Sequence, residues 1–177
     1  MKKYDIIYAD PPWRYNFSKS NSRKIENKYE SMSLNEICNL DIPSKDNSVL
    51  YLWATAPKLQ EALKVMECWG FEYKTHLIWD KERIGMGYWF RGKHELLLVG
   101  VKGKFSPPSQ KDRVSSVFRC RRDNVHSKKP FVVYKWIESW FPNCKYLEMF
   151  ARKTSFGWDV WGDEVESDIN IEKRDDE

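Results

Sequence analysis

Residues 4–13 read Tyr-Asp-Ile-Ile-Tyr-Ala-Asp-Pro-Pro-Trp, a short apolar run that ends in an aspartate, two prolines and a tryptophan. The run from Tyr4 to Ala9 is rich in aromatic and β-branched residues, which predicts a buried strand. Proline fixes its own φ and has no N–H for a sheet ladder, so Pro11 and Pro12 predict that the strand stops before them. The carboxyl group of Asp10 is therefore expected at the carboxyl end of the first strand.

Apolar runs and helical patterns follow one another through the rest of the chain. Further strands are predicted at residues 48–54, 74–79, 95–102 and 145–150. A helix is predicted after Pro57, and Ser33 with Glu36 has the spacing of a capping box at the start of a shorter helix. A third helix is predicted to begin at Pro130. This alternation predicts an α/β sandwich with a mostly parallel sheet.

The length of 177 residues suits one domain, and 41% hydrophobic and 15% aromatic residues exclude a disordered chain. We expect that domain over residues 1–165, followed by an acidic, disordered tail over residues 166–177. The chain has no apolar run of the roughly 18 residues that a membrane span needs. Its first residues do not resemble a signal peptide, so we expect a cytoplasmic protein without membrane contact.

The cysteines and histidines give no sign of a metal site. The four cysteines are far apart in the sequence, and the three histidines do not cluster with them. Zinc sites are typically built on close cysteine pairs, so the cysteines are predicted to be free thiols and no metal is expected.

Positive charge is concentrated in two segments. The net charge of the chain is +4, of which residues 166–177 contribute −4, so residues 1–165 carry +8. The basic residues gather within residues 19–28 and 113–129, in stretches predicted to be loops near the carboxyl ends of strands. Such segments suit the phosphates of a nucleic acid, and a solvated surface explains them equally well at this point.

Residues 4–13 resemble the catalytic strand and loop of the MT-A70 family of adenine-N6 methyltransferases. Further blocks similar to the family follow in order at residues 29–37, 50–55, 69–71, 78–81, 94–103, 126–130, 147–152 and 157–164. The resemblance covers about residues 4–165. It implies a Rossmann-like class I methyltransferase sandwich in permuted order, with the catalytic loop ahead of the cofactor-binding strand. It also implies S-adenosyl-L-methionine as the cofactor.

The chemistry of adenine methylation accounts for the segment Asp10, Pro11, Pro12, Trp13, which we take as the catalytic loop. The N6 lone pair is delocalised into the ring, so the amine is a poor nucleophile. A carboxylate and a backbone carbonyl that accept its two N–H groups favour a pyramidal nitrogen. Trp13 offers a face on which the base could stack. The alternative is a proline-containing turn without a catalytic role.

The resemblance also assigns binding residues. Those expected at the cofactor are Lys102, Glu148, Phe150, Arg152, Thr154, Ser155, Asp163 and Glu164. Asp163 stands where the family commonly has asparagine. Those expected on the target-base side are Tyr15, Tyr29, His94 and Glu95, with Lys19, Arg23, Lys24 and Lys28 for the phosphates. His94 is either a general base or a structural histidine. Trp53, Trp79 and Trp89 are expected in the core, and the alternative is that they are platforms for base stacking.

The partner implied by the resemblance is nucleic acid, with DNA favoured over RNA. Because a stacked adenine cannot reach a buried cofactor, the target must be single-stranded or flipped out. Alternatives are a non-catalytic, nucleic-acid-binding subunit of a methyltransferase complex and an N4-cytosine methyltransferase. A homodimer or a complex with a methyltransferase-like partner is possible.

Overall fold

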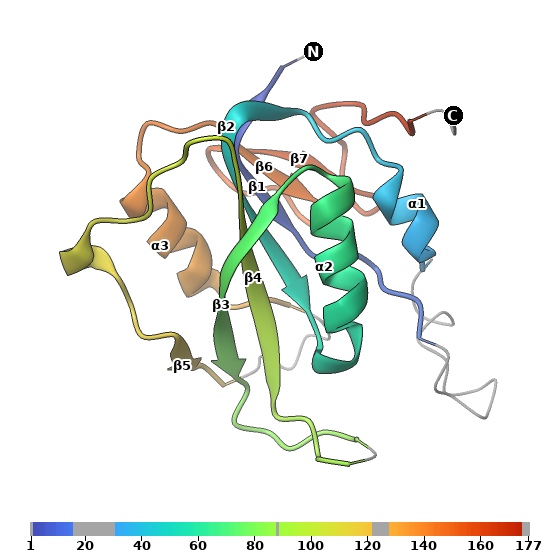
Figure 1. Cartoon of the computed structure of the whole chain (residues 1–177), viewed down its shortest axis with the longest axis vertical. Helices are drawn as coiled ribbons and strands as arrows, with labels where there is room; N and C mark the ends of the chain where they lie inside the picture. Colours follow the sequence, from blue (N-terminus) through green and yellow to red (C-terminus); the bar gives the residue numbers. More distant parts are fainter. Residues whose placement is uncertain (1, 16–30, 88, 122–127, 175–177) are drawn as a thin grey trace.

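The computed structural model describes residues 2–15, 31–87, 89–121 and 128–174 of the chain. Within these residues seven strands form a single sheet in the order β5-β3-β4-β2-β1-β6-β7 (Figure 1). The strands are β1 (Tyr4–Ala9), β2 (Ser44–Ala54), β3 (Glu72–Asp80), β4 (His94–Lys102), β5 (Val117–Arg119), β6 (Tyr146–Met149) and β7 (Trp158–Trp161). The helices are α1 (Leu34–Cys38), α2 (Leu59–Cys68), α3 (Phe131–Trp140) and the 3-10 turns η3 (Ala56–Lys58) and η4 (Gln110–Asp112).

Six of the seven strands run in the same direction. Strand β1 is parallel to β2 and β6, β6 is parallel to β7, and β3 is parallel to β5. Strand β4 is antiparallel to both of its neighbours, β2 and β3. We call the edge at which the six parallel strands end the carboxyl edge, and the opposite one the amino edge. The amino end of β4 therefore lies at the carboxyl edge, and its carboxyl end lies at the amino edge.

Each face of the sheet carries its own hydrophobic core, because successive side chains of a strand point to opposite faces. Ile7 of β1 belongs to the cluster that includes residues of α1 and α2. Ile6 and Tyr8 belong to the other cluster, which α3 covers with Val133, Tyr134 and Ile137. Helices α2 and α3 thus lie on opposite sides of the sheet (Figure 1). The predicted α/β sandwich with a mostly parallel sheet is confirmed.

The elements predicted from the sequence are present within a few residues of their expected bounds. The capping box at α1 is formed, since Ser33 N donates to Glu36 Oε2 at 2.8 Å and Glu36 N donates to Ser33 Oγ at 3.3 Å. Strands β5 and β7 were not predicted. They have three and four residues, which is too short for an alternating pattern to be read.

Residues 166–174 pack against the domain, although a disordered tail was expected from residue 166. Ile171 is buried in the α1–α2 core, and Asp168 accepts a hydrogen bond from Val160 N of β7 at 2.9 Å. Arg174 donates to the carbonyl of Cys68 at 2.8 Å. The apolar side chains of Ile169 and Ile171 within the acidic run provide the anchor that composition alone concealed.

Candidate active site

The aspartate that follows β1 lies in a turn with well-defined partners. Trp13 N donates to the carbonyl of Pro11 at 2.8 Å, and Met32 N donates to the carbonyl of Pro12 at 3.0 Å. The indole N–H of Trp13 donates to the carbonyl of Trp53 at 3.1 Å, and the ring is only 5% exposed. Trp13 therefore fixes the turn to the end of β2. Its faces are covered, so the expected stacking of a base on Trp13 does not fit this arrangement.

Asp10 is joined to Glu95 by the ammonium group of Lys129. Lys129 Nζ lies 3.0 Å from Asp10 Oδ1 and 3.0 Å from Glu95 Oε2. The other oxygen of Glu95 is 3.1 Å from Lys81 Nζ. Lys129 is 11% exposed and lies 5.4 Å from the ring centre of Trp53, so this cation is held away from bulk water. The four groups come from the ends of β1, β3 and β4 and from the residue before Pro130.

The charges in this cluster support one another. Burial lowers the pKa of Lys129, but the carboxylates of Asp10 and Glu95 outweigh burial and hold that pKa above its ordinary value. Burial raises the pKa of Asp10, and Lys129 only partly opposes it. Burial on its own would raise the pKa of Glu95, but Lys129 and Lys81 outweigh burial. The pKa of Glu95 is therefore below its ordinary value. Lys129 is thus the fixed cation of the cluster.

Strand β6 brings a second group of predicted residues to the same edge. Ala9 pairs with Met149, so Asp10 and Phe150 leave neighbouring strands side by side. Phe150 has a φ of 60°, a left-handed conformation that is rare for a bulky residue and turns the chain sharply. Ala151 N then donates to the carbonyl of Trp161 at 2.9 Å. A Cβ on Gly162 would meet the Ala151 carbonyl oxygen at 2.2 Å, which explains the glycine after β7.

The remaining predicted cofactor residues fall into two places around this turn. Arg152 Nε lies 3.5 Å from Glu164 Oε1, which joins the loops after β6 and β7. Thr154 and Asp163 are exposed in those same loops, and Ser155 is half-buried. The carbonyl of Ser155 accepts a hydrogen bond from Trp158 N at 3.1 Å.

Glu148 is a buried carboxyl group just below this edge. It is 8% exposed, and its Oε1 accepts a hydrogen bond from the hydroxyl of Tyr134 at 2.8 Å. Its Oε2 is buried without a hydrogen-bond partner in the part of the chain that the structure describes. Burial raises the pKa of Glu148 to about 7. A buried oxygen without a partner, such as Glu148 Oε2, can accept a hydrogen bond from a donor group of a bound molecule.

Lys102 lies outside this site, which corrects the assignment made from the sequence. It ends β4, and because β4 is antiparallel this end lies at the amino edge, in register with Ser48. Its ammonium group donates to Ser44 Oγ at 3.2 Å. The cation found beside Asp10 is instead Lys129, which the sequence showed only as part of a family-like block at residues 126–130.

The residues predicted on the target-base side are only partly described. The hydroxyl of Tyr15 lies 2.7 Å from Thr55 Oγ1, and Lys58 Nζ lies 5.1 Å from the centre of its ring. His94 is exposed at the start of β4, opposite Asp80, and Glu95 follows it in the charged cluster. The other five, Tyr29, Lys19, Arg23, Lys24 and Lys28, lie outside the described residues.

The three other tryptophans named from the sequence divide into two groups. Trp53 and Trp79 are buried, with 0% and 2% exposure, which confirms their place in the core. Trp89 is 91% exposed in the loop between β3 and β4, so the expectation of a core position was wrong.

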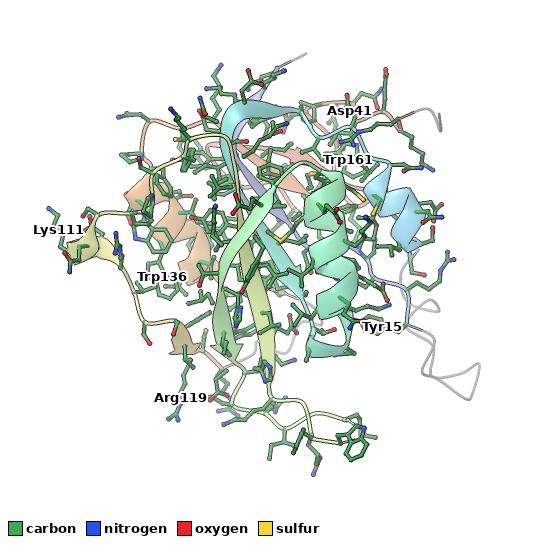
Figure 2. The ribbon with its side chains drawn as sticks, viewed as in Figure 1. Tyr15, Asp41, Lys111, Arg119, Trp136 and Trp161 are labelled. Carbon is green, nitrogen blue, oxygen red and sulfur yellow. The ribbon has the colours of Figure 1, made fainter. Side chains whose placement is uncertain are left out.

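Among its described residues, the second basic segment reaches the carboxyl edge at Arg119 and at Lys129. Because β4 ends at the amino edge, the chain crosses the sheet before β5 pairs in parallel with β3. Arg119, at the end of β5, lies 3.3 Å from Asp80 Oδ2. Figure 2 shows Arg119 and Tyr15 at the same end of the molecule as the loop between β3 and β4.

Among the described residues, no helix is long and apolar enough to cross a membrane. The same residues contain no group of three or more histidine, cysteine, aspartate or glutamate side chains placed to hold a metal ion.

Comparison with known proteins gives matches along nearly the whole chain. The family model MT-A70 matches residues 4–164. The type II methyltransferase M.MunI of a Mycoplasma species is 37% identical over 93% of this chain and 78% of its own length. The human N(6)-adenosine-methyltransferase catalytic subunit METTL3 is 29% identical over 86% of this chain, and a putative MT-A70-like relative from Medicago truncatula is 28% identical over 93%. The chain spans 26% and 27% of the length of these two relatives.

Proposed function

The chain belongs to the MT-A70 family of adenine-N6 methyltransferases, and from this premise we propose that it transfers a methyl group from S-adenosyl-L-methionine to N6 of adenine in nucleic acid. The observation that carries the proposal is the carboxyl group of Asp10, held 3.0 Å from Lys129 at the end of the strand next to β6. We propose that the methyltransferase domain spans residues 1–165, with residues 166–174 packed against it.

Asp10 is proposed to orient the target amine. When bound, S-adenosyl-L-methionine supplies an electrophilic methyl group on its sulfonium sulfur. Asp10 accepts one N6 hydrogen, and the carbonyl of Pro11 or Pro12, each of which keeps a second lone pair, accepts the other. These contacts favour a pyramidal nitrogen whose lone pair points at the methyl group. The N–C bond forms as the bond between the methyl carbon and the sulfonium sulfur breaks, and the nitrogen then releases its proton to water, so Asp10 need not act as a strong base.

Lys129 is proposed to keep Asp10 ionised. Burial alone favours the neutral acid, which would donate a hydrogen bond where the amine needs an acceptor. The ammonium group of Lys129 opposes this and is shared with Glu95, which Lys81 also neutralises. The arrangement supplies an electrostatic environment that is set before the substrate binds.

The residues around the end of β6 fit S-adenosyl-L-methionine. The unpaired Glu148 Oε2 suits an ammonium or hydroxyl donor of the cofactor. Lys129 lies at the carboxyl edge, whereas Lys102 lies at the amino edge, so Lys129 is the cation proposed for the carboxylate of the cofactor. The left-handed backbone of Phe150 turns the chain after β6. The ribose of the cofactor and its neighbourhood are proposed to contact the residues around this turn: Arg152, Thr154, Ser155, Asp163 and Glu164.

DNA is proposed as the target in preference to RNA. The relative named a type II methyltransferase is 37% identical and shares 78% of its length with this chain, against 29% and 26% for the human N(6)-adenosine-methyltransferase subunit. A homodimer or a methyltransferase-like partner remains part of the proposal, because the human relative is named a catalytic subunit.

The test is transfer of labelled methyl groups to DNA and RNA pools, followed by analysis of the nucleosides. We expect label in N6-methyladenine with wild-type protein and none with Asp10→Ala. Label in N4-methylcytosine would replace the proposed base. Cofactor and nucleic-acid binding without any transfer would identify a non-catalytic subunit.

A further inference from the structure

The loop between β3 and β4 exposes large apolar side chains. We call the described residues between these strands, 81–87 and 89–93, the β3–β4 loop. Met86, Trp89 and Phe90 are 90%, 91% and 88% exposed, and Ile84 is 59% exposed. Several exposed apolar side chains on one loop are unfavourable in water, and exposed apolar surface gathered in one place often marks an interaction site.

The backbone of the β3–β4 loop is fixed by its own hydrogen bonds. Gly85 N donates to the carbonyl of Gly92 at 2.6 Å, and Gly92 N donates to the carbonyl of Met86 at 3.2 Å. Arg91 Nε donates to the carbonyl of Gly85 at 3.2 Å. A Cβ on Gly87 would lie 2.0 Å from the carbonyl oxygen of Phe90, so only glycine fits there. This closed loop holds Trp89 and Phe90 together, away from the core.

The loop projects from the carboxyl edge, beside the proposed active site. Its first residue, Lys81, contacts Glu95, and Glu95 contacts Lys129, which contacts Asp10. Three contacts of 3.0–3.1 Å thus connect the base of the loop to the catalytic aspartate. Figure 1 shows the loop extending beyond the ends of β2 and β3. A polymer that presents an adenine to Asp10 therefore passes near the loop.

The charge of the loop favours a polyanion over an apolar protein surface. Residues 81–93 contain four basic residues and one acidic residue. Arg83 and Arg91 are exposed, whereas Lys81 and Lys93 are paired with Glu95 and Asp80. Exposed arginines beside exposed aromatic rings are the combination that binds phosphates and stacks on bases.

We propose that the β3–β4 loop binds the nucleic acid next to the target adenine, with Trp89 and Phe90 stacked on bases and Arg83 and Arg91 on phosphates. The proposal rests on the function proposed above. An adenine that leaves the stack to reach Asp10 uncovers the faces of its neighbours, and aromatic rings at the edge of the site cover those faces again. Trp89 then provides the face for base stacking that Trp13 cannot provide because it is buried.

The proposal is tested by binding and kinetics with matched variants. The probe is a fluorescein-labelled, adenine-containing 20-nucleotide single-stranded DNA, with the same sequence as RNA and as duplex DNA. Trp89→Ala/Phe90→Ala is expected to weaken binding by at least tenfold, since one lost stack costs roughly 5- to 150-fold. Trp89→Phe keeps an aromatic face and should stay within about threefold of wild type. Tyr73→Ala, an exposed aromatic residue at the amino edge, is the control and should bind as wild type does.

The kinetics and the assembly state separate this role from others. With the double variant we expect a higher KM for nucleic acid, an unchanged kcat at saturation and unchanged cofactor affinity by calorimetry. Unchanged nucleic-acid affinity and KM would overturn the proposal. So would loss of a wild-type dimer in sedimentation by the double variant, because that result assigns the loop to a protein interface. If wild-type protein transfers no methyl group but the double variant still loses nucleic-acid binding, the proposed function fails and the loop proposal stands.

Discussion

Lys129 Nζ lies 3.0 Å from Asp10 Oδ1, although the two residues are more than a hundred positions apart in the sequence. One closes the first strand of the sheet, and the other immediately precedes the proline that begins α3. The contact links the turn after β1 to the segment before α3 at the carboxyl edge. It makes the charge of the proposed catalytic residue dependent on a segment that the motif around Asp10 does not contain.

Asp10→Ala is expected to abolish methyl transfer while leaving the fold and cofactor binding intact. Loss of one preorganised electrostatic contact costs about 3–4 kcal/mol, or roughly 10²- to 10³-fold in rate. Asp10→Asn should also fail, though less completely, because its amide oxygen still accepts a hydrogen bond without the charge. Single-turnover transfer measures the loss and calorimetry measures cofactor affinity. Near wild-type rates with Asp10→Ala would leave Asp10 as a turn residue.

Lys129→Met is expected to lower both stability and cofactor affinity. It leaves Asp10 without its cation in a partly buried site, and breaking such a pair costs about 3 kcal/mol. Lys102→Met is the matched control, since Lys102 donates to Ser44 Oγ at the amino edge, and it should change cofactor affinity little. Denaturant unfolding and calorimetric titration with S-adenosyl-L-methionine provide the two readouts.

A double variant separates the pair from general damage at the site. In the Asp10→Ala background, Lys129→Met should cost less stability than in wild type, because no unpaired Asp10 carboxylate is left behind. Equal losses in both backgrounds would contradict a direct interaction. A loss of cofactor affinity with Lys102→Met equal to that with Lys129→Met would return Lys102 to the site.

The fold class could be predicted from the sequence because the longer buried strands carry patterns that local chemistry determines. β1 is a short apolar run ended by two prolines, and α1 begins at a complete capping box. The direction of β4 could not be predicted, because an apolar run such as residues 95–101 pairs equally well in either sense. Lys102 was assigned to the cofactor through the resemblance, and the antiparallel direction of β4 places it at the other edge.

The site was predicted where its residues follow strands and missed where tertiary packing decides. Asp10 and Arg152 follow β1 and β6, which are neighbours in the sheet, so both residues lie at the carboxyl edge. Lys129 becomes a buried cation only when α3 packs near β1 and β4. Trp89 was expected in the core on its residue type, but a glycine-rich hairpin with its own hydrogen bonds keeps it in solvent.

Neutralising the first basic segment is expected to weaken nucleic-acid binding and flatten its dependence on salt. The change is Lys19, Arg23, Lys24 and Lys28 together to alanine, at positions outside the described residues. Each lost phosphate contact lowers the slope of log affinity against log salt by about 0.7–0.9. Binding titrations between low and physiological salt provide the measurement, and cofactor affinity should be unchanged. An unaltered slope would leave these residues as a solvated surface.

Glu148 is expected to make stability and cofactor affinity depend on pH. Burial raises its pKa from 4.5 to about 7, so the folded protein holds the proton more tightly than the unfolded chain does. Its contribution to stability is therefore present below pH 4.5 and is lost as the pH rises toward 7, by about 3 kcal/mol at most. Glu148→Gln should remove this part of the pH dependence, which denaturant unfolding at several pH values measures as the difference from wild type.

A cofactor donor that meets Glu148 Oε2 prefers the ionised carboxyl group. Wild-type affinity for S-adenosyl-L-methionine should then increase from pH 6 to 8, and that of Glu148→Gln should not. Parallel pH profiles for the two proteins would show that Glu148 is a structural acid without a role at the cofactor.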